Sequence, residues 1–310
     1  MLRPGWYVLL YHEVSWEEPP ALRGIGGMTV PPDRFEEHLA VLEDAGRLCS
    51  PDEAMERMAR AGEQSGGKAG SASLDEPLIS LWFDDGYTGV RRYAAPAMAR
   101  RELTATISIC SRFALRQEMY WRCQLGTLAA SDGLRFLRSR MRKLGVDPGA
   151  SVKDTTMDAF TPELRDAVEK AYRKHLPEEA RLDAFRIFDT VDGLRALADT
   201  GWTLANHSAA HWPIGERAAI EHLEAQFTEC EEACAKAGLK LSDDWVLPFD
   251  RQRADELELE FRRVAPERRL VLVGNQVNRA DTLERRVISR IVAPPVSGNE
   301  LIARMKRAAG

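Results

Sequence analysis

The sequence predicts an α/β fold, a closed or nearly closed barrel of about seven parallel strands. Roughly seven short apolar segments alternate with segments of helical period along the 310 residues, and this alternation is typical of parallel sheets. Acidic residues and histidines directly follow several of the apolar segments, and a β/α barrel carries its functional residues at that end of its strands. An open doubly wound sheet is the second choice, because the chain has no glycine-rich phosphate loop.

The expected strands are short apolar or β-branched runs. The central one, residues 78–83, contains neither Pro nor Gly, which suits a strand that is covered on both faces. The strands are expected at residues 6–11, 78–83, 104–110, 202–205, 244–249, 270–274 and 286–292.

The expected helices have recognisable ends. In the first, Pro32 suits the opening turn and Gly46 the end, and Gly238 ends a later one. Residues 62–73 are rich in Gly, Ser and Ala and are expected to form a surface loop. Helices are expected at residues 31–46, 90–101, 190–200, 216–237 and 252–264, after Pro51, and from about Ser297.

The pattern changes between residues 112 and 186, where the chain is charged, helical and without clear strands. Residues 133–144 and 163–175 have amphipathic spacing. We interpret this stretch as a helical insertion over one end of a single domain, residues 1–310. An independent small domain is the alternative.

Two neighbouring aspartates, Asp84 and Asp85, stand at the end of the central strand. Carboxylates are costly to bury there unless something pairs with them. Strand neighbours point to opposite faces, but Gly86 allows the chain to bend so that both side chains reach one mouth. A metal ion suits one carboxylate and proton transfer the other. Taken alone, the motif also fits an ordinary turn between strand and helix.

A histidine pair follows another apolar run. His207 and His211 come after residues 202–205, and their spacing suits one metal ion if the segment takes a helical turn. A histidine pair with this spacing, taken alone, usually lies on the surface and binds nothing. Its occurrence at a strand end, in a chain that also has a strand-end aspartate pair, favours a metal site.

These motifs resemble those of the polysaccharide deacetylases, carbohydrate esterase family four. Residues 80–87 (SLWFDDGY) resemble the first signature of the family, residues 207–211 (HSAAH) the second, and residues 246–249 (VLPF) a weakened third. The resemblance covers most of the chain except about residues 112–186. It implies a distorted (β/α) barrel and the hydrolysis of an N-acetyl group.

The resemblance also implies roles for individual residues. Asp85, His207 and His211 would bind one divalent metal ion, Asp84 would be the general base, and the backbone N–H of Phe249 would stabilise the oxyanion. Zinc is the expected ion, and Co²⁺, Ni²⁺, Mn²⁺ and Fe²⁺ suit the same ligands.

The sequence departs from the family pattern in two places. The family's late histidine is missing, since the last histidine is His222. Tyr11-His12 resembles the N-terminal motif of the permuted poly-N-acetylglucosamine deacetylase branch, so we expect His12 to be the general acid. The alternative is that His12 is an ordered residue at the strand end that bonds only to the backbone. The third motif lacks its arginine, and Arg290 is the candidate to brace Asp84.

Three other residues are candidates for substrate contacts. Asp250 follows the third motif, and we expect it to cap the next helix rather than to bind sugar hydroxyls. Trp121 and Trp212 could stack on a sugar ring, although core or rim packing explains each equally well.

The expected function is metal-dependent hydrolysis that removes an N-acetyl group from an amino sugar of a glycoconjugate or its precursor. For a cytoplasmic protein, a nucleotide-linked, lipid-linked or small-molecule sugar is favoured over finished cell wall. Two alternatives stay open: hydrolysis of a non-sugar amide, formamide or cyclic imide, and a non-catalytic carbohydrate-binding module. Acetate release from N-acetylated sugars separates the first two.

Composition limits the location and the partners. The net charge of −5 gives no reason to expect nucleic-acid binding, and no apolar run approaches the ~20 residues of a membrane span. Five cysteines without framework spacing are expected to be buried thiols. We expect a cytoplasmic protein, unless an export signal preceded this sequence. The oligomeric state is not predicted.

Overall fold

The computed structural model describes residues 1–19, 22, 28–64, 74–129, 133–149, 151–216, 219–249 and 255–310. The expected loop at residues 62–73 lies mostly outside these residues, as do Asp250 and the expected first turn of the helix at residues 252–264.

The strands form one parallel sheet that is nearly closed into a barrel, as predicted. Neighbours in the sheet follow the order β10-β9-β8-β7-β6-β5-β1-β11. Only Arg290 separates β10 from β11, so the last stretch of strand pairs with β9 on one side and with β1 on the other. The strands are β1 Gly5–Tyr11, β5 Pro77–Phe83, β6 Thr106–Ile109, β7 Thr203–Asn206, β8 Asp244–Val246, β9 Arg269–Leu272, β10 Val287–Ser289 and β11 Ile291–Val292.

Three two-residue strands lie outside this order. β4, Arg47–Leu48, pairs with the first half of β5. β2, Glu13–Val14, and β3, Thr29–Val30, form a separate small sheet beyond the end of β1.

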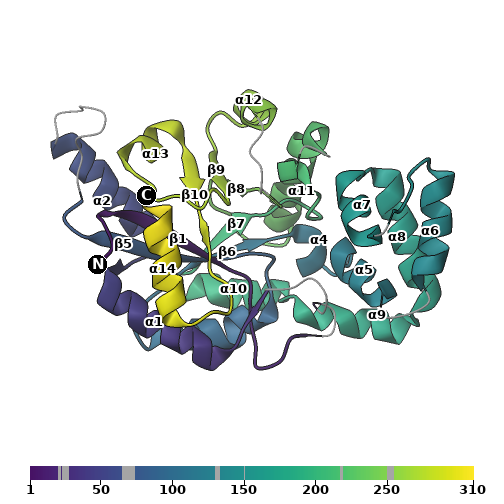
Figure 1. Cartoon of the computed structure of the whole chain (residues 1–310), viewed down its shortest axis with the longest axis horizontal. Helices are drawn as coiled ribbons and strands as arrows, with labels where there is room; N and C mark the ends of the chain where they lie inside the picture. The colour runs from purple at the N-terminus through teal and green to yellow at the C-terminus, as the bar shows by residue number, and fades with distance from the viewer. Residues whose placement is uncertain are drawn as a thin grey trace.

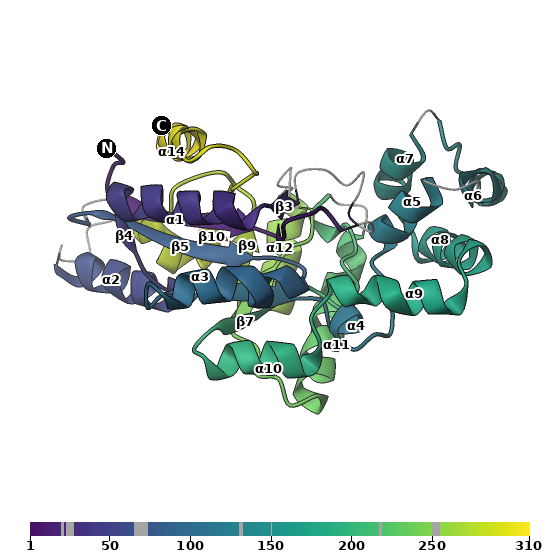
Figure 2. The ribbon, with the colours of Figure 1, turned by 90° about the horizontal axis from the view of Figure 1, so that it is seen from below.

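Helices surround the barrel and connect its strands (Figures 1 and 2). After β5, a π-helical turn η2, Val90–Ala94, continues directly into α3, Ala95–Ala99. The Ser297 side chain and Glu300 form a capping box at the start of the last helix. The other helices around the barrel are α1 Pro32–Ala45, α2 Pro51–Gln64, α10 Val191–Asp199, α11 Leu223–Lys236, α12 Asp255–Val264, α13 Ala280–Arg285 and α14 Gly298–Ala308.

The stretch between β6 and α10 is helical and lies as a lobe beside the barrel (Figures 1 and 2). A buried apolar cluster runs from this lobe into the barrel, with Trp121, Phe160 and Leu164 on one side and Tyr87 and Trp245 on the other. The helices of the lobe are α4 Ser111–Ala114, α5 Trp121–Ala129, α6 Gly133–Lys143, α7 Val152–Asp158, α8 Pro162–His175, α9 Glu178–Ala184 and η3 Phe185–Ile187.

The main differences from the prediction are two element boundaries and one additional helix. The helix expected at residues 216–237 begins only at Leu223, after the short turns η4, Ile214–Glu216, and η5, Ile220–His222. The strand expected at residues 244–249 ends at Val246, and the positive φ of Phe249 is incompatible with a strand. α13 was not predicted, because its six residues are too few to show a helical period.

Alternation along the strands decides which side chains face the barrel interior. Trp6 and Val8 of β1 join a cluster that draws on six strands, including Trp82, Ala205 and Ile288. The residues between them, Tyr7, Leu9 and Tyr11, join a second cluster with the surrounding helices. The same alternation, extended past the end of each strand, predicts which side chains reach the open end of the barrel, its mouth.

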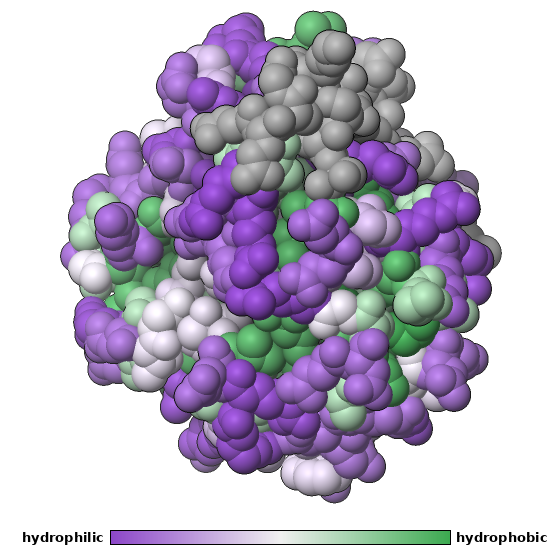
Figure 3. Space-filling view, turned by 90° about the vertical axis from the view of Figure 1, so that its left-hand side faces the viewer, coloured by the Kyte–Doolittle hydropathy of each residue, from purple (hydrophilic) through white to green (hydrophobic). Residues whose placement is uncertain are grey.

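The end of the molecule farthest from the lobe is mostly hydrophilic, with apolar areas between polar side chains (Figure 3). Within the described residues, none of the helices has the length and apolarity needed to cross a membrane. The five cysteines are all buried and unpaired, as predicted.

Candidate metal centre

Asp84 and Asp85 close the central strand and are almost fully buried, at 3% and 1% exposure. Asp84 still continues the sheet, since its N–H donates to the Tyr11 carbonyl oxygen at 3.0 Å. Asp85 and Gly86 then take left-handed backbone, with φ of 71° and 73°. This turn breaks the alternation of the strand, so that both carboxylates lie near His207.

His207 and His211 lie on an irregular loop after β7, and not on the helical turn that was the condition for their spacing to suit one ion. Ser208 and His211 have φ of 70° and 54°. Two side-chain hydrogen bonds hold the loop: Asn206 Oδ1 accepts from the Ser208 N–H at 2.9 Å, and Ser208 Oγ accepts from the His211 N–H at 3.0 Å. The two rings converge because of this loop, with centroids 4.7 Å apart.

Asp85, His207 and His211 bring three potential metal ligands together. One ligand atom from each lies within 4.8 Å of the other two. Asp85 Oδ1 is 3.1 Å from His211 Nε2 and 3.4 Å from His207 Nε2. His207 Nδ1 donates to the Val246 carbonyl oxygen at 2.8 Å, which directs the lone pair of Nε2 toward Asp85.

These residues fit a divalent cation. Neither carboxylate oxygen of Asp85 forms a hydrogen bond within the part of the chain that the structure describes, and burying a carboxylate that lacks hydrogen bonds is costly. Burial opposes its charge, yet His211 and His207 hold the pKa of Asp85 well below its ordinary value. Two imidazoles and one ionised carboxylate match hydrolytic zinc sites that keep positions open.

Asp84 is bound differently, through one oxygen. Its Oδ1 accepts from Arg290 Nη1 at 2.6 Å and from the Ser108 hydroxyl. Its Oδ2 lies 3.7 Å from His207 Nε2, toward the ligand group. Burial raises the pKa of Asp84, but Arg290, His207 and His12 together hold it below the ordinary value. Asp84 is therefore ionised at neutral pH.

Alternation explains why distant residues meet here. Trp82, Ala205 and Ile288 point into the barrel, and two residues further on are Asp84, His207 and Arg290. Ser108 faces inward by the same count, since Ile107 and Ile109 join the outer cluster. Ser108 was not predicted as a site residue, although the period of two in β6 places it on the inward face.

His12 and Phe249 complete the mouth. His12 is partly exposed at the end of β1, where burial lowers its pKa and the charges of Asp85 and Asp84 oppose that shift. Phe249 has a φ of 59°, and its ring meets the His211 ring edge-on at 4.6 Å. Within the described residues, no acceptor is paired with the Phe249 N–H.

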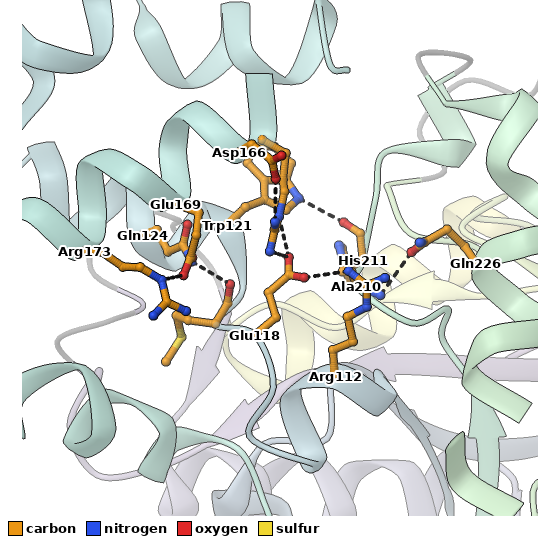
Figure 4. Close-up of polar contacts among 12 residues, drawn as sticks. Arg112, Glu118, Trp121, Gln124, Asp166, Glu169, Arg173, Ala210, His211 and Gln226 are labelled. Carbon is orange, nitrogen blue, oxygen red and sulfur yellow. Dashed lines mark hydrogen bonds and ion pairs between the residues drawn. The ribbon is translucent and has the colours of Figure 1, made fainter. Parts of the chain in front are cut away.

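Three consecutive residues of the helical lobe form a wall beside the candidate metal ligands. The Tyr120 ring lies 4.6 Å from the His211 ring. The indole N–H of Trp121 donates to the His211 carbonyl oxygen at 3.0 Å (Figure 4). Arg122 lies over the Phe249 ring, 5.0 Å from its centroid. The sequence does not reveal this wall, because no local pattern says which residues of the insertion turn toward the barrel.

The two tryptophans that could stack on a sugar ring, Trp121 and Trp212, take different positions. Trp121 is buried, with its indole committed to the His211 loop, and is packed rather than open to a sugar. Trp212 is only partly buried, and its ring lies against Phe160 at 5.3 Å and His222 at 5.0 Å.

Buried charge fixes the wall to the barrel. Glu118 accepts from Arg112 at 2.8 Å (Figure 4). It also accepts from Arg165 of α8 at 2.7 Å. Arg112 also pairs with Glu229 of α11 at 2.7 Å. Gln226, on the same helix, accepts from the Ala210 N–H at 3.1 Å, so α11 and the lobe hold opposite sides of the His211 loop.

The buried carboxyl group of Glu13, next to His12, should make the stability of the folded protein depend on pH. Burial raises its pKa from 4.5 to about 8, although the Gly89 N–H and Arg92 oppose the shift. The folded protein therefore keeps the proton between about pH 4.5 and 8, where the unfolded chain releases it. Stability should then fall as pH rises through this window, by about 1.4 kcal/mol per pH unit from this group.

The Glu13→Gln variant isolates this effect, because glutamine cannot ionise. The unfolding free energy in urea, measured at pH 6 and 7.5, should favour the variant by about 2 kcal/mol more at the higher pH. An unchanged difference between variant and wild type at the two pH values would contradict the raised pKa.

Solved structures of polysaccharide deacetylases share the architecture over nearly the whole chain. The deacetylase PplD of Streptococcus pyogenes, in complex with acetate, is 15% identical with a TM-score of 0.55, over 98% of this chain and 99% of that one. IcaB from Ammonifex degensii is 14% identical with a TM-score of 0.57, over 98% of both chains. A de-N-acetylase from Aggregatibacter actinomycetemcomitans is 16% identical with a TM-score of 0.57, over 97% and 99%.

Sequence comparison gives no such match, since no family model and no curated protein matches the chain. The similarity to the deacetylases is therefore found by comparing structures and not by comparing sequences. The chain has the fold of the polysaccharide deacetylases.

Proposed function

We propose that this protein is a metal-dependent hydrolase that removes an N-acetyl group from an amino sugar. One observation carries the proposal: Asp85, His207 and His211 bring their ligand atoms within 4.8 Å of one another, beside a second aspartate that Arg290 pairs. The shared fold with deacetylases agrees with this assignment without naming the substrate.

The ligand set would hold one divalent ion, with zinc as the expected metal. When bound, such an ion lowers the pKa of water and polarises an acyl oxygen. His207 is oriented for this task by Val246, and His211 by Ser208 and Trp121. Replacing a residue that orients a metal ligand in this way typically lowers metal affinity or activity 10–100-fold.

Asp84 is proposed as the general base. Its Oδ1 is occupied by Arg290 and Ser108, which leaves Oδ2 on the ligand side to accept a proton from the attacking water. Arg290 has two effects in this role: it keeps the carboxylate ionised and fixes its orientation.

The remaining two roles belong to Phe249 and His12. The Phe249 N–H would donate to the oxygen that gains charge as the acyl carbon is attacked. His12 would donate a proton to the leaving amine. Its lowered pKa makes the protonated imidazole a stronger acid than free histidine.

Acetate release tests the proposal. The panel holds N-acetylated sugars in free, nucleotide-linked, lipid-linked and oligosaccharide form, offered to the protein before and after chelation and after addition of Zn²⁺, Co²⁺, Ni²⁺, Mn²⁺ or Fe²⁺. We expect release from at least one sugar, lost on chelation and restored by a metal. If no sugar releases acetate and a non-sugar amide is hydrolysed, the amidase alternative would replace the proposal. Sugar binding without turnover would favour a carbohydrate-binding module.

A further inference from the structure

Arg122 is an arginine in an unusual setting beside the metal ligands. Its side chain is only 9% exposed, and no carboxylate of the described ranges lies within ion-pair distance of it. Arginine is rarely buried this far unless it is paired. A cation–π contact with a phenylalanine stabilises a cation much less than desolvation destabilises it. The Phe249 ring alone therefore does not account for the position of Arg122.

The nearby acidic groups are engaged elsewhere. Asp84 pairs with Arg290, and Asp85 faces His207 and His211. Glu118, four residues before Arg122, is bound by Arg112 and Arg165. Among the residues that the structure describes, the Arg122 guanidinium is thus left with the Phe249 ring and the neighbouring Tyr120 hydroxyl.

The position of Arg122 directs its charge to the site. It is the second residue of α5, and Tyr120 and Trp121 at the same end contact His211. The positive end of the α5 dipole therefore lies at the metal ligands together with Arg122. A planar guanidinium at such a place matches the two oxygens of a carboxylate or a phosphate.

We propose that Arg122 binds an anionic group, a phosphate or a carboxylate, that the substrate carries near its N-acyl group. The inference rests on the proposed function for the acyl group and goes beyond it, because it assigns an acidic rather than a neutral sugar. It also gives the helical lobe a part in substrate selection, since α5 belongs to that lobe.

Equilibrium binding tests the proposal without turnover. The zinc-loaded protein with Asp84→Asn is titrated calorimetrically, at one ionic strength, with three probes. These are the neutral methyl glycoside of N-acetylglucosamine, N-acetylglucosamine 1-phosphate, and N-acetylmuramic acid, which carries a carboxylate. At least one anionic probe should bind about 10-fold or more tightly than the neutral one, as expected for a charge-assisted contact. The probe that does so identifies a phosphorylated or a carboxylated sugar.

Variants of Arg122 decide whether this residue is responsible. The affinity gap is the ratio between the Kd of the neutral probe and the Kd of the anionic probe. In Arg122→Gln this gap should largely close, and Arg122→Lys should retain part of it. Arg140→Gln, with the same charge change on an exposed residue of α6, should leave the gap intact.

Three results would overturn the proposal: equal binding of all three probes, a gap that persists in Arg122→Gln, or an equal loss for all probes in that variant. Failure of the proposed function looks different. A wild-type protein that releases no acetate, but whose gap depends on Arg122, would reject deacetylation and leave the anion site in place.

Discussion

Replacing Asp84 with asparagine should lower the rate of acetate release by about 10²–10⁴-fold, the usual contribution of a general base, while the metal stays bound. Asparagine keeps the shape of the side chain but cannot take a proton at the position of Oδ2. The three proposed metal ligands, Asp85, His207 and His211, are unchanged in this variant.

The metal content of the variant separates this explanation from loss of the site. We expect one tightly bound ion in wild type and in Asp84→Asn, and loss of the ion in Asp85→Ala, measured by elemental analysis after dialysis. If Asp84→Asn also loses the metal, Asp84 is a ligand. If it keeps both metal and full activity, another residue is the base.

Replacing Arg290 with methionine should destabilise the fold by about 3–5 kcal/mol, because it leaves Asp84 buried without its cation. Arg290 is fully buried, contacts Asp84 at 2.6 Å, and separates β10 from β11 at the point where the barrel closes. The unfolding free energy in urea, measured with chelator present so that metal binding does not contribute, gives the size of the effect.

A double-mutant cycle attributes this loss to the pair. Adding Asp84→Asn to Arg290→Met should recover part of the stability, because no unpaired carboxylate then stays buried. Additive single effects would mean that Arg290 acts by packing on Trp82, whose ring it also covers at 5.7 Å. Arg60→Met serves as the control, since Arg60 and Glu56 are both exposed, and a change within about 0.5 kcal/mol is expected.

Most of the fold was predictable because its signals are local. Apolar runs of period two and helical segments with caps alternate along the chain, and the sheet built from them is the parallel, nearly closed barrel that was expected. The wrong boundaries lie where local signals are weak, at the turns before α11 and at the end of β8.

The candidate site divides in the same way. Asp84, Asp85 and the histidine pair stand at strand ends in the sequence, and the barrel brings them into one mouth. Their backbone could not be predicted, because positive φ at Asp85 and His211 is unfavourable locally and is imposed by contacts from elsewhere. For this reason the segment at residues 207–211 brings its histidines together without the helical turn that their spacing alone would require.

The sequence by itself determined the strand and helix order, the polar residues at the strand ends and the residue types of the candidate metal site, because these depend on residue type and short spacing. Only the tertiary structure decided that Arg290 meets Asp84 across 206 positions, that Ser108 joins them, and that Arg122 of the lobe faces Phe249. Pairing of this kind depends on barrel closure and on which face of a helix turns inward. Both arise from packing between segments that are far apart in the chain.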